Sequence, residues 1–121
     1  MNFNLKKILD TNSKLIEECK SISNDLWTTG ENLFNLCWRE SLFEKRIIYL
    51  NENAKKTDDI KTELIEYLKV LKFFKEELVF LWTFVENKKT LKAIQKSIKF
   101  VEETGRNILT EKKKLMWTTL S

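Results

Sequence analysis

The sequence predicts an all-α fold, an antiparallel up-down-up-down four-helix bundle, on the strength of three observations. First, its 121 residues include no proline and only two glycines, whereas a β-rich or α/β domain of this size needs many turn residues. Second, apolar residues recur at alternating steps of three and four, which is the spacing of one helix face. Third, the breaks in this pattern are short. The length is that of a single domain, residues 1–121.

Four segments carry the pattern, and we expect helices over residues 3–27, 30–54, 58–86 and 89–117. Segments of matched length joined by short breaks are typical of an antiparallel bundle. The positions that follow the three-and-four spacing are Leu5, Ile8, Asn12, Leu15, Cys19, Ile22 and Leu26 in the first segment, Leu33, Leu36, Glu40, Phe43, Ile47, Leu50 and Ala54 in the second, Ile60, Leu64, Tyr67, Leu71, Phe74, Leu78, Leu81 and Val85 in the third, and Leu91, Ile94, Ile98, Val101, Gly105, Ile108, Lys112 and Leu115 in the fourth.

Helix-capping residues lie at each break. The first break, Thr28 to Glu31, fits a capping box, and the second offers Thr57 as an N-cap with two carboxylates in the following turn. At the third break, residues 86–90, either Asn87 or Thr90 is the cap. This break lacks glycine and proline, so three longer helices are the alternative architecture.

Gly105 interrupts the apolar line of the fourth segment without ending it, because the line continues to Ile108 and Leu115. We therefore expect a seam glycine at a close contact between two helices, at a local cost of about 1 kcal/mol relative to alanine.

The residue inventory argues against an enzyme. The sequence has no histidine, which is the commonest general base, a common metal ligand and the usual activator of serine and cysteine nucleophiles. Its two glycines, Gly30 and Gly105, are too far apart to form a phosphate-binding loop. We predict no catalytic residue, no cofactor, no metal site and no small-molecule substrate.

Cys19 and Cys37 flank the first break, so antiparallel helices bring them to about the same level. One interpretation is a disulfide or redox pair; the favoured one is two buried, reduced thiols. With no signal peptide and no apolar run of the roughly 20 residues that cross a bilayer, we expect a cytoplasmic protein without a membrane span.

Three polar residues, Asn12, Glu40 and Lys112, interrupt the seams. Asparagine at such a position can fix helix register, and the lysine stem can lie on the core while its amine reaches water. Glu40 either pairs with a basic group of a partner or reaches solvent through a slight rotation of the helix. We favour the rotation, which places Trp38 and Leu42 in the core, because buried carboxylates are rare.

The third segment carries a second apolar stripe, formed by Phe73, Phe80 and Phe84 with Val79 beside it. At about 100° per residue it lies roughly 120–140° from the centre of the first stripe. The two stripes together cover a wider arc than a bundle helix usually buries. We expect this stripe to contact another chain. The alternative is a central third helix, packed on both sides, which buries both stripes.

Basic residues gather on one side of the fourth segment. Residues 61–121 hold thirteen basic and eight acidic residues, against nine and ten in residues 1–60. The stripe comprises Lys88, Lys92, Lys96, Lys99, Arg106, Lys113 and Lys114. It suits a phosphate backbone or an acidic protein, and Phe100, expected to be exposed, would stack on an unpaired base. We favour the simpler interpretation, a solvated face of a lysine-rich chain, over these binding functions.

These observations predict a non-enzymatic helical-bundle interaction protein. It would act as a homo-oligomer, or as a small subunit or adaptor of a larger assembly, through Phe73, Val79, Phe80 and Phe84. The alternative is a nucleic-acid-binding protein that uses the lysine-rich face of the fourth helix.

Overall fold

The computed structural model describes residues 5–26, 31–53 and 57–120 of the chain. These residues form four helices, α1 (Leu5–Leu26), α2 (Glu31–Asn53), α3 (Thr57–Phe84) and α4 (Lys88–Leu120), and no strand occurs among them. The prediction of an all-α, four-helix fold is confirmed. The helix limits differ from the expected ones by one to three residues.

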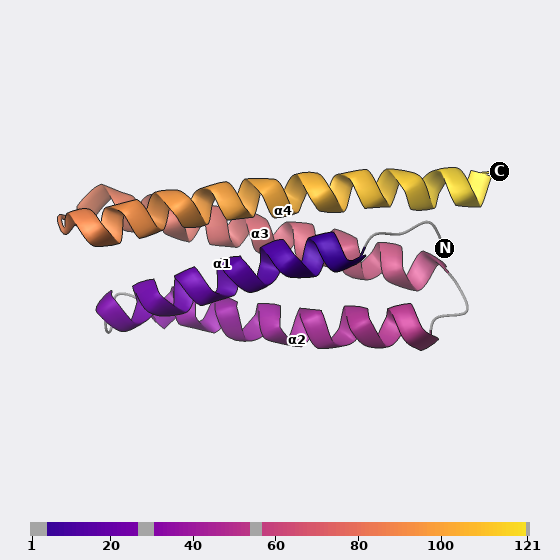
Figure 1. The fold of residues 1–121 in the computed structure, drawn as a ribbon, viewed down its shortest axis with the longest axis horizontal. Helices are drawn as coiled ribbons and strands as arrows, with labels where there is room; N and C mark the ends of the chain where they lie inside the picture. Colours follow the sequence, from indigo (N-terminus) through magenta and orange to yellow (C-terminus); the bar gives the residue numbers. More distant parts are fainter. Residues whose placement is uncertain (1–4, 27–30, 54–56, 121) are drawn as a thin grey trace.

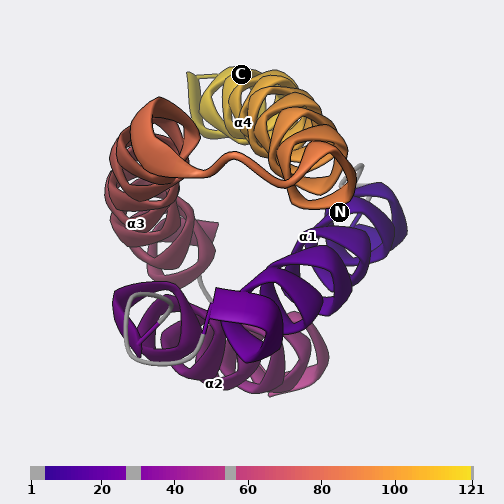
Figure 2. The same ribbon diagram turned by 90° about the vertical axis from the view of Figure 1, so that its left-hand side faces the viewer.

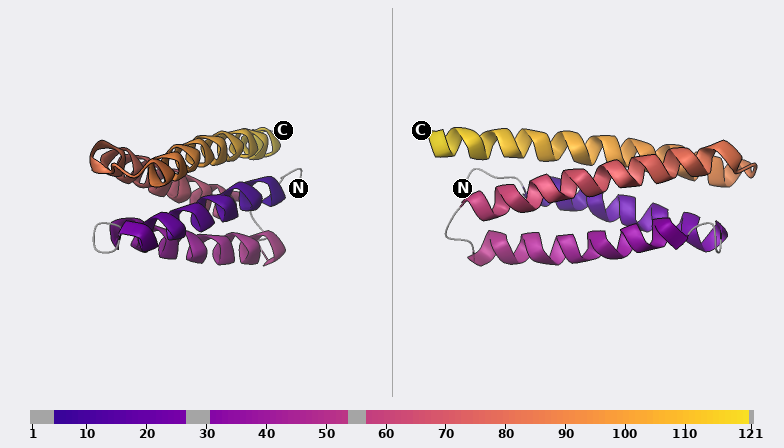
Figure 3. Two further views of the ribbon diagram at one scale, coloured as in Figure 1. Left: turned by 60° about the vertical axis from the view of Figure 1, so that its left-hand side comes forward. Right: turned by 180° about the vertical axis from the view of Figure 1, so that it is seen from behind.

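The four helices run alternately up and down around a common axis (Figure 1). Seen along this axis they form a ring, in which each helix packs against the two neighbours beside it (Figure 2). The packed pairs are α1 with α2, α2 with α3, α3 with α4, and α4 with α1. From behind, α3 lies between α4 and α2, the two described helices that pack against it (Figure 3).

The third break is real, which excludes three longer helices. Helix α3 ends at Phe84 and α4 begins at Lys88. Asn87, one of the two candidate caps, accepts hydrogen bonds at its Oδ1 from the backbone N–H groups of Lys89 (2.9 Å) and Thr90 (3.2 Å). It therefore satisfies two of the free donors at the start of α4. The proposed caps Thr28 and Thr57 lie outside the residues whose side chains are described.

The predicted seams meet in the centre of the ring. The stripe from Ile60 to Leu81 is fully or nearly fully buried, as are Ile8, Leu15, Leu33 and Ile47. The rings of Phe43 on α2 and Tyr67 on α3 stack with their centroids 3.9 Å apart. Burial of this continuous apolar surface is the main force that holds the four helices together.

The expectation for Gly105 is half right. Helix α4 continues through this residue, but a Cβ atom added there would meet no atom within 4 Å. Gly105 therefore does not lie at a close contact between two helices. It falls on the apolar line of α4 by its spacing in the sequence alone. Glycine has a lower helix propensity than alanine, and at this position no close approach of a neighbouring helix compensates for the difference.

Replacing Gly105 by alanine should raise the free energy of unfolding by about 0.5–1 kcal/mol, because alanine has less backbone freedom to lose and fits without a clash. Urea unfolding followed by circular dichroism measures the change. The control is Gln95→Ala at an exposed position of α4, where the expected change is within about 0.5 kcal/mol. A loss of stability in Gly105→Ala would contradict the open surroundings of this residue.

Candidate functional site

The second apolar stripe of α3 lies on the surface of the bundle. Phe73, Val79, Phe80 and Phe84 expose between 44% and 59% of their surface, and we call these four residues the α3 aromatic face. The neighbouring rings of Phe80 and Phe84 meet edge to face, with centroids 5.2 Å apart. Among the four described helices, α3 packs against α2 and α4 alone, so the alternative of a central third helix that buries both stripes is wrong.

The members of the α3 aromatic face do not all point the same way. By helical geometry Phe73, Phe80 and Phe84 fall within about 40° of one another, whereas Val79 projects about 100° away from Phe80. Beside Phe73, the surface between α3 and α2 is hollowed to a volume of about 350 Å³. Leu36, Arg39 and Glu77 also line this hollow. The face therefore joins projecting rings to an adjacent groove.

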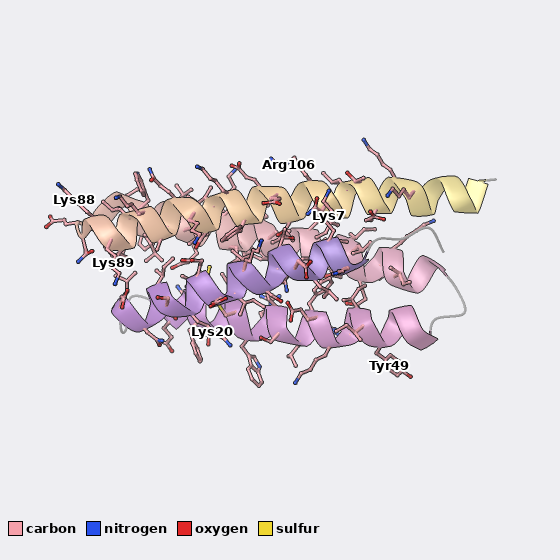
Figure 4. All side chains as sticks on the ribbon, viewed as in Figure 1. Lys7, Lys20, Tyr49, Lys88, Lys89 and Arg106 are labelled. Carbon is pink, nitrogen blue, oxygen red and sulfur yellow. The ribbon has the colours of Figure 1, made fainter. Side chains whose placement is uncertain are left out.

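A second group of exposed apolar residues lies on the outer side of α2. Phe34, Trp38, Leu42 and Tyr49 are all exposed, and Figure 4 shows Tyr49 pointing away from the bundle. Sequence reasoning missed this group, because it assigned Trp38 and Leu42 to the core. The regular step of four residues from Phe34 to Trp38 to Leu42 was the available signal.

The expectation that Glu40 reaches solvent is wrong. Only 1% of its surface is exposed, whereas Trp38 and Leu42 expose 64% and 41%. The physical reason is that Cys37, Phe43 and Ile47 are all buried, and a rotation that turned Trp38 inward would expose them. Burial raises the pKa of the Glu40 carboxyl to about 9, so this group is protonated at neutral pH.

Glu40 belongs to a set of buried polar side chains contributed by all four helices. On α1, Asn12 donates a hydrogen bond from Nδ2 to Glu44 Oε1 of α2 (2.7 Å), which suits the predicted role of this residue in fixing register. Among the described groups, neither Glu40 oxygen nor the Tyr67 hydroxyl has a hydrogen-bond partner. Further members on α4 are Ser97, Thr104 and Asn107. Burial also raises the pKa of Tyr67 well above its usual value.

Cys19 and Cys37 are both buried and free. The Cys37 thiol donates a weak hydrogen bond to the backbone carbonyl of Ile16 (3.8 Å). The hydrogen bond with Cys37, together with burial, raises the pKa of the Cys19 thiol well above its ordinary value. The same hydrogen bond lowers the pKa of the Cys37 thiol. Because both side chains are almost completely buried, we interpret the pair as structural thiols rather than reactive ones.

All seven residues of the predicted basic stripe are exposed on α4, and Figure 4 shows Lys88 and Arg106 on the side of the molecule away from α2. Lys96 pairs with Glu18 of α1 (3.0 Å) and Lys114 with Glu111 (3.1 Å). Within the described part of the chain, no carboxylate pairs with the remaining five, which are Lys88, Lys92, Lys99, Arg106 and Lys113.

Phe100 is not the exposed stacking residue that was expected. It is partly buried against the core, and Lys96 Nζ lies 5.8 Å from the centroid of its ring. Its ring therefore already contacts other residues of the protein, and we no longer expect Phe100 to stack on an unpaired base.

Comparison with protein-family models, with curated proteins and with solved structures finds no match to this chain. Within residues 5–26, 31–53 and 57–120, no helix is both long enough and apolar enough to cross a lipid bilayer. The same residues contain no cluster of three or more side chains suited to holding a metal ion.

The burial of Glu40 predicts a pH-dependent stability. Its pKa is raised to about 9 in the folded protein, so between about pH 5 and pH 9 the folded state binds a proton that the unfolded state has released. The free energy of unfolding should therefore fall as pH rises, by up to about 1.4 kcal/mol per pH unit. In the Glu40→Gln variant, the free energy of unfolding should not show this decrease. Urea unfolding at several pH values from 5 to 9 measures it.

The matched control is Glu103→Gln, which removes an exposed carboxylate and should leave the pH slope of the wild type unchanged. Equal slopes for the wild type and Glu40→Gln would show that Glu40 is not held neutral in the folded protein.

Proposed function

We propose that this chain is a non-enzymatic interaction protein that works as a homo-oligomer through the α3 aromatic face. The observation that carries the proposal is the half-exposure of Phe73, Phe80 and Phe84 on a helix whose other stripe already fills the core. Contact with a different helical protein, as a small subunit or adaptor of a larger assembly, is the other form of the same hypothesis.

The size of the exposed surface supports an interface. Three half-exposed phenylalanines, at roughly 200 Å² each, present roughly 300 Å² of apolar area. This area is at the lower end of the roughly 300–600 Å² that the largest apolar patch of a monomer covers, and such patches are often functional. Aromatic residues are also typical anchors of interfaces. None of these three phenylalanines belongs to the described hydrophobic core.

The shape of the surface favours a second copy of the chain as the partner. A two-fold interface places the same patch on both subunits, so it must combine projections with hollows that receive them. The rings of Phe80 and Phe84 project, and the hollow beside Phe73 lies on the same side of α3. Its lining carries both signs of charge, Arg39 against Glu76 and Glu77, which suits contact with an identical lining.

The chemistry of the chain supports a non-catalytic role. Histidine is missing from the sequence, and the buried thiols are of the structural kind. A cytoplasmic setting agrees with the proposal, because reducing conditions keep Cys19 and Cys37 unpaired.

Replacing Phe80 and Phe84 by serine should lower the oligomeric mass and leave the helical content nearly unchanged. At about 1–3 kcal/mol for each buried aromatic anchor, the double change should weaken association by at least about 30-fold. Size-exclusion chromatography with light scattering measures the mass, and circular dichroism measures the helical content.

The control changes Phe34 and Trp38 to serine on the outer side of α2, where exposure is similar, and should keep the mass of the wild type. A drop in mass for this control alone would move the interface to α2. Loss of helical content in Phe80→Ser/Phe84→Ser would show that these residues support the core instead.

Nucleic-acid binding through α4 is the second candidate function. The observation that favours it is the set of five exposed cations without an ion-pair partner among the described residues. From Lys88 to Lys113 they extend over about 38 Å of helix, a length that can follow several phosphates. Lysine outnumbers arginine in the set, which points to contact with the phosphate backbone rather than base readout.

If α4 binds nucleic acid, changing Lys92, Lys99 and Arg106 to glutamine should reduce the salt dependence of the affinity for short duplex DNA. Each lost phosphate contact lowers the slope of log K against log salt by about 0.9. Fluorescence anisotropy at several salt concentrations measures the slope. The control removes Lys14, Lys45 and Lys72, which are exposed on the other three helices. Equal slopes in both variants would exclude this face.

A further inference from the structure

A small polar hollow opens between α2 and α3, separate from the α3 aromatic face. Its volume is about 120 Å³, which equals the volume of roughly four water molecules in the liquid. Glu40, Phe43 and Tyr67 line its buried part, and Arg39, Arg46, Glu63 and Glu66 contribute its charged surroundings. Helix packing thus places a carboxyl group, a phenol and a phenyl ring around one small hollow.

The buried groups of this hollow have unused hydrogen-bonding capacity. Glu40 and Tyr67 are at least 99% buried, and neither Glu40 oxygen nor the Tyr67 hydroxyl meets a partner among the described groups. Buried polar atoms are normally hydrogen-bonded, and exceptions call for a reason. Tyr67 also stacks on Phe43, so its position is fixed by packing rather than by a hydrogen bond.

We propose that this hollow binds a small organic cation, namely a guanidinium or primary alkylammonium head group, by hydrogen bonds to the Glu40 carboxylate and the Tyr67 hydroxyl oxygen. The cation donates N–H groups to the oxygens that have no partner, and its alkyl part lies against Phe43 and Tyr67. Aromatic faces and carboxylates together are a typical environment for such cations. The proposal is independent of the α3 aromatic face.

The charges of the lining favour a cation over an anion. With Glu40 protonated, the two carboxylates of Glu63 and Glu66 balance the two guanidinium groups of Arg39 and Arg46. Ionisation of Glu40 then supplies one negative charge, which a monovalent cation neutralises and an anion does not. Arg46 is already engaged with Glu63, since its Nε lies 3.8 Å from Glu63 Oε2. The hollow is less suited to a metal ion, because the described residues contain no cluster of three or more suitable ligands.

Binding should be linked to a proton. Burial raises the pKa of Glu40 to about 9, so at pH 7.5 the group is neutral, and the incoming cation ionises it with release of about one proton to solvent. The affinity should therefore rise about tenfold per pH unit up to about pH 9. The titratable and charged groups around Glu40 are Cys37, Arg39, Glu44 and Arg46 from α2, Glu63, Glu66 and Tyr67 from α3, and Cys19 from α1, which lies against Cys37.

Isothermal titration of the full chain with butylguanidinium tests the proposal, with butylurea as the uncharged isostere and blocked arginine amide as the same head group on a peptide unit. We expect butylguanidinium to bind the wild type and butylurea not to bind. Titration in buffers of different ionisation enthalpy should report release of about one proton at pH 7.5. Tighter binding of the arginine amide would assign the site to a side chain of a partner protein, and tighter binding of butylguanidinium to a free small molecule.

Glu40→Gln keeps the size of the side chain and should weaken binding at least tenfold while abolishing proton release. Tyr67→Phe should weaken binding severalfold and keep proton release, and Glu103→Gln, at an exposed site on α4, should change neither. Circular dichroism confirms that each variant is folded. The proposal is overturned if the wild type does not bind butylguanidinium, if butylurea binds equally well, if pentanoate binds more tightly, or if Glu40→Gln binds like the wild type.

Discussion

The geometry of a four-helix ring limits how much apolar surface each helix can bury, and the rest of this structure follows from that limit. Each helix packs against two neighbours and turns one arc toward the centre. Helix α3 carries more apolar surface than this arc can take up: the stripe from Ile60 to Leu81 fills the core, and Phe73, Phe80 and Phe84 remain outside. Because the hydrophobic effect acts on any apolar area in water, the same force that closes the bundle also favours a contact on the outside of α3.

The interior is not uniformly apolar, and its polar residues are placed where they specify structure at a cost in stability. Asn12 bonds Glu44 across α1 and α2, which ties the two helices at one register. Glu40 and Tyr67 lie in the same interior without partners among the described groups. An apolar side chain at position 40 would avoid the cost of burying a carboxyl group. A buried carboxyl beside a small hollow therefore points to a requirement other than stability.

Much of the fold could be predicted from the sequence, because the three-and-four spacing identifies the buried face of each helix and Asn87 marks the least obvious break. The α3 aromatic face was also placed correctly on the surface. The errors concern Glu40, Trp38, Leu42, Phe100 and Gly105. Each of these depends on how far a helix is rotated or how closely its neighbour approaches, and helical periodicity alone determines neither. The rule that carboxylates avoid the core also gave the wrong answer for Glu40, because Cys37, Phe43 and Ile47 fix the rotation of α2.

Sedimentation equilibrium of the unmodified protein, over about 1 to 100 μM, tests most directly whether the surplus apolar surface of α3 is an interface. We expect a mass that rises with concentration from the 14.5 kDa of the single chain toward a whole multiple of it. A mass that stays at 14.5 kDa over the whole range would contradict self-association through the α3 aromatic face.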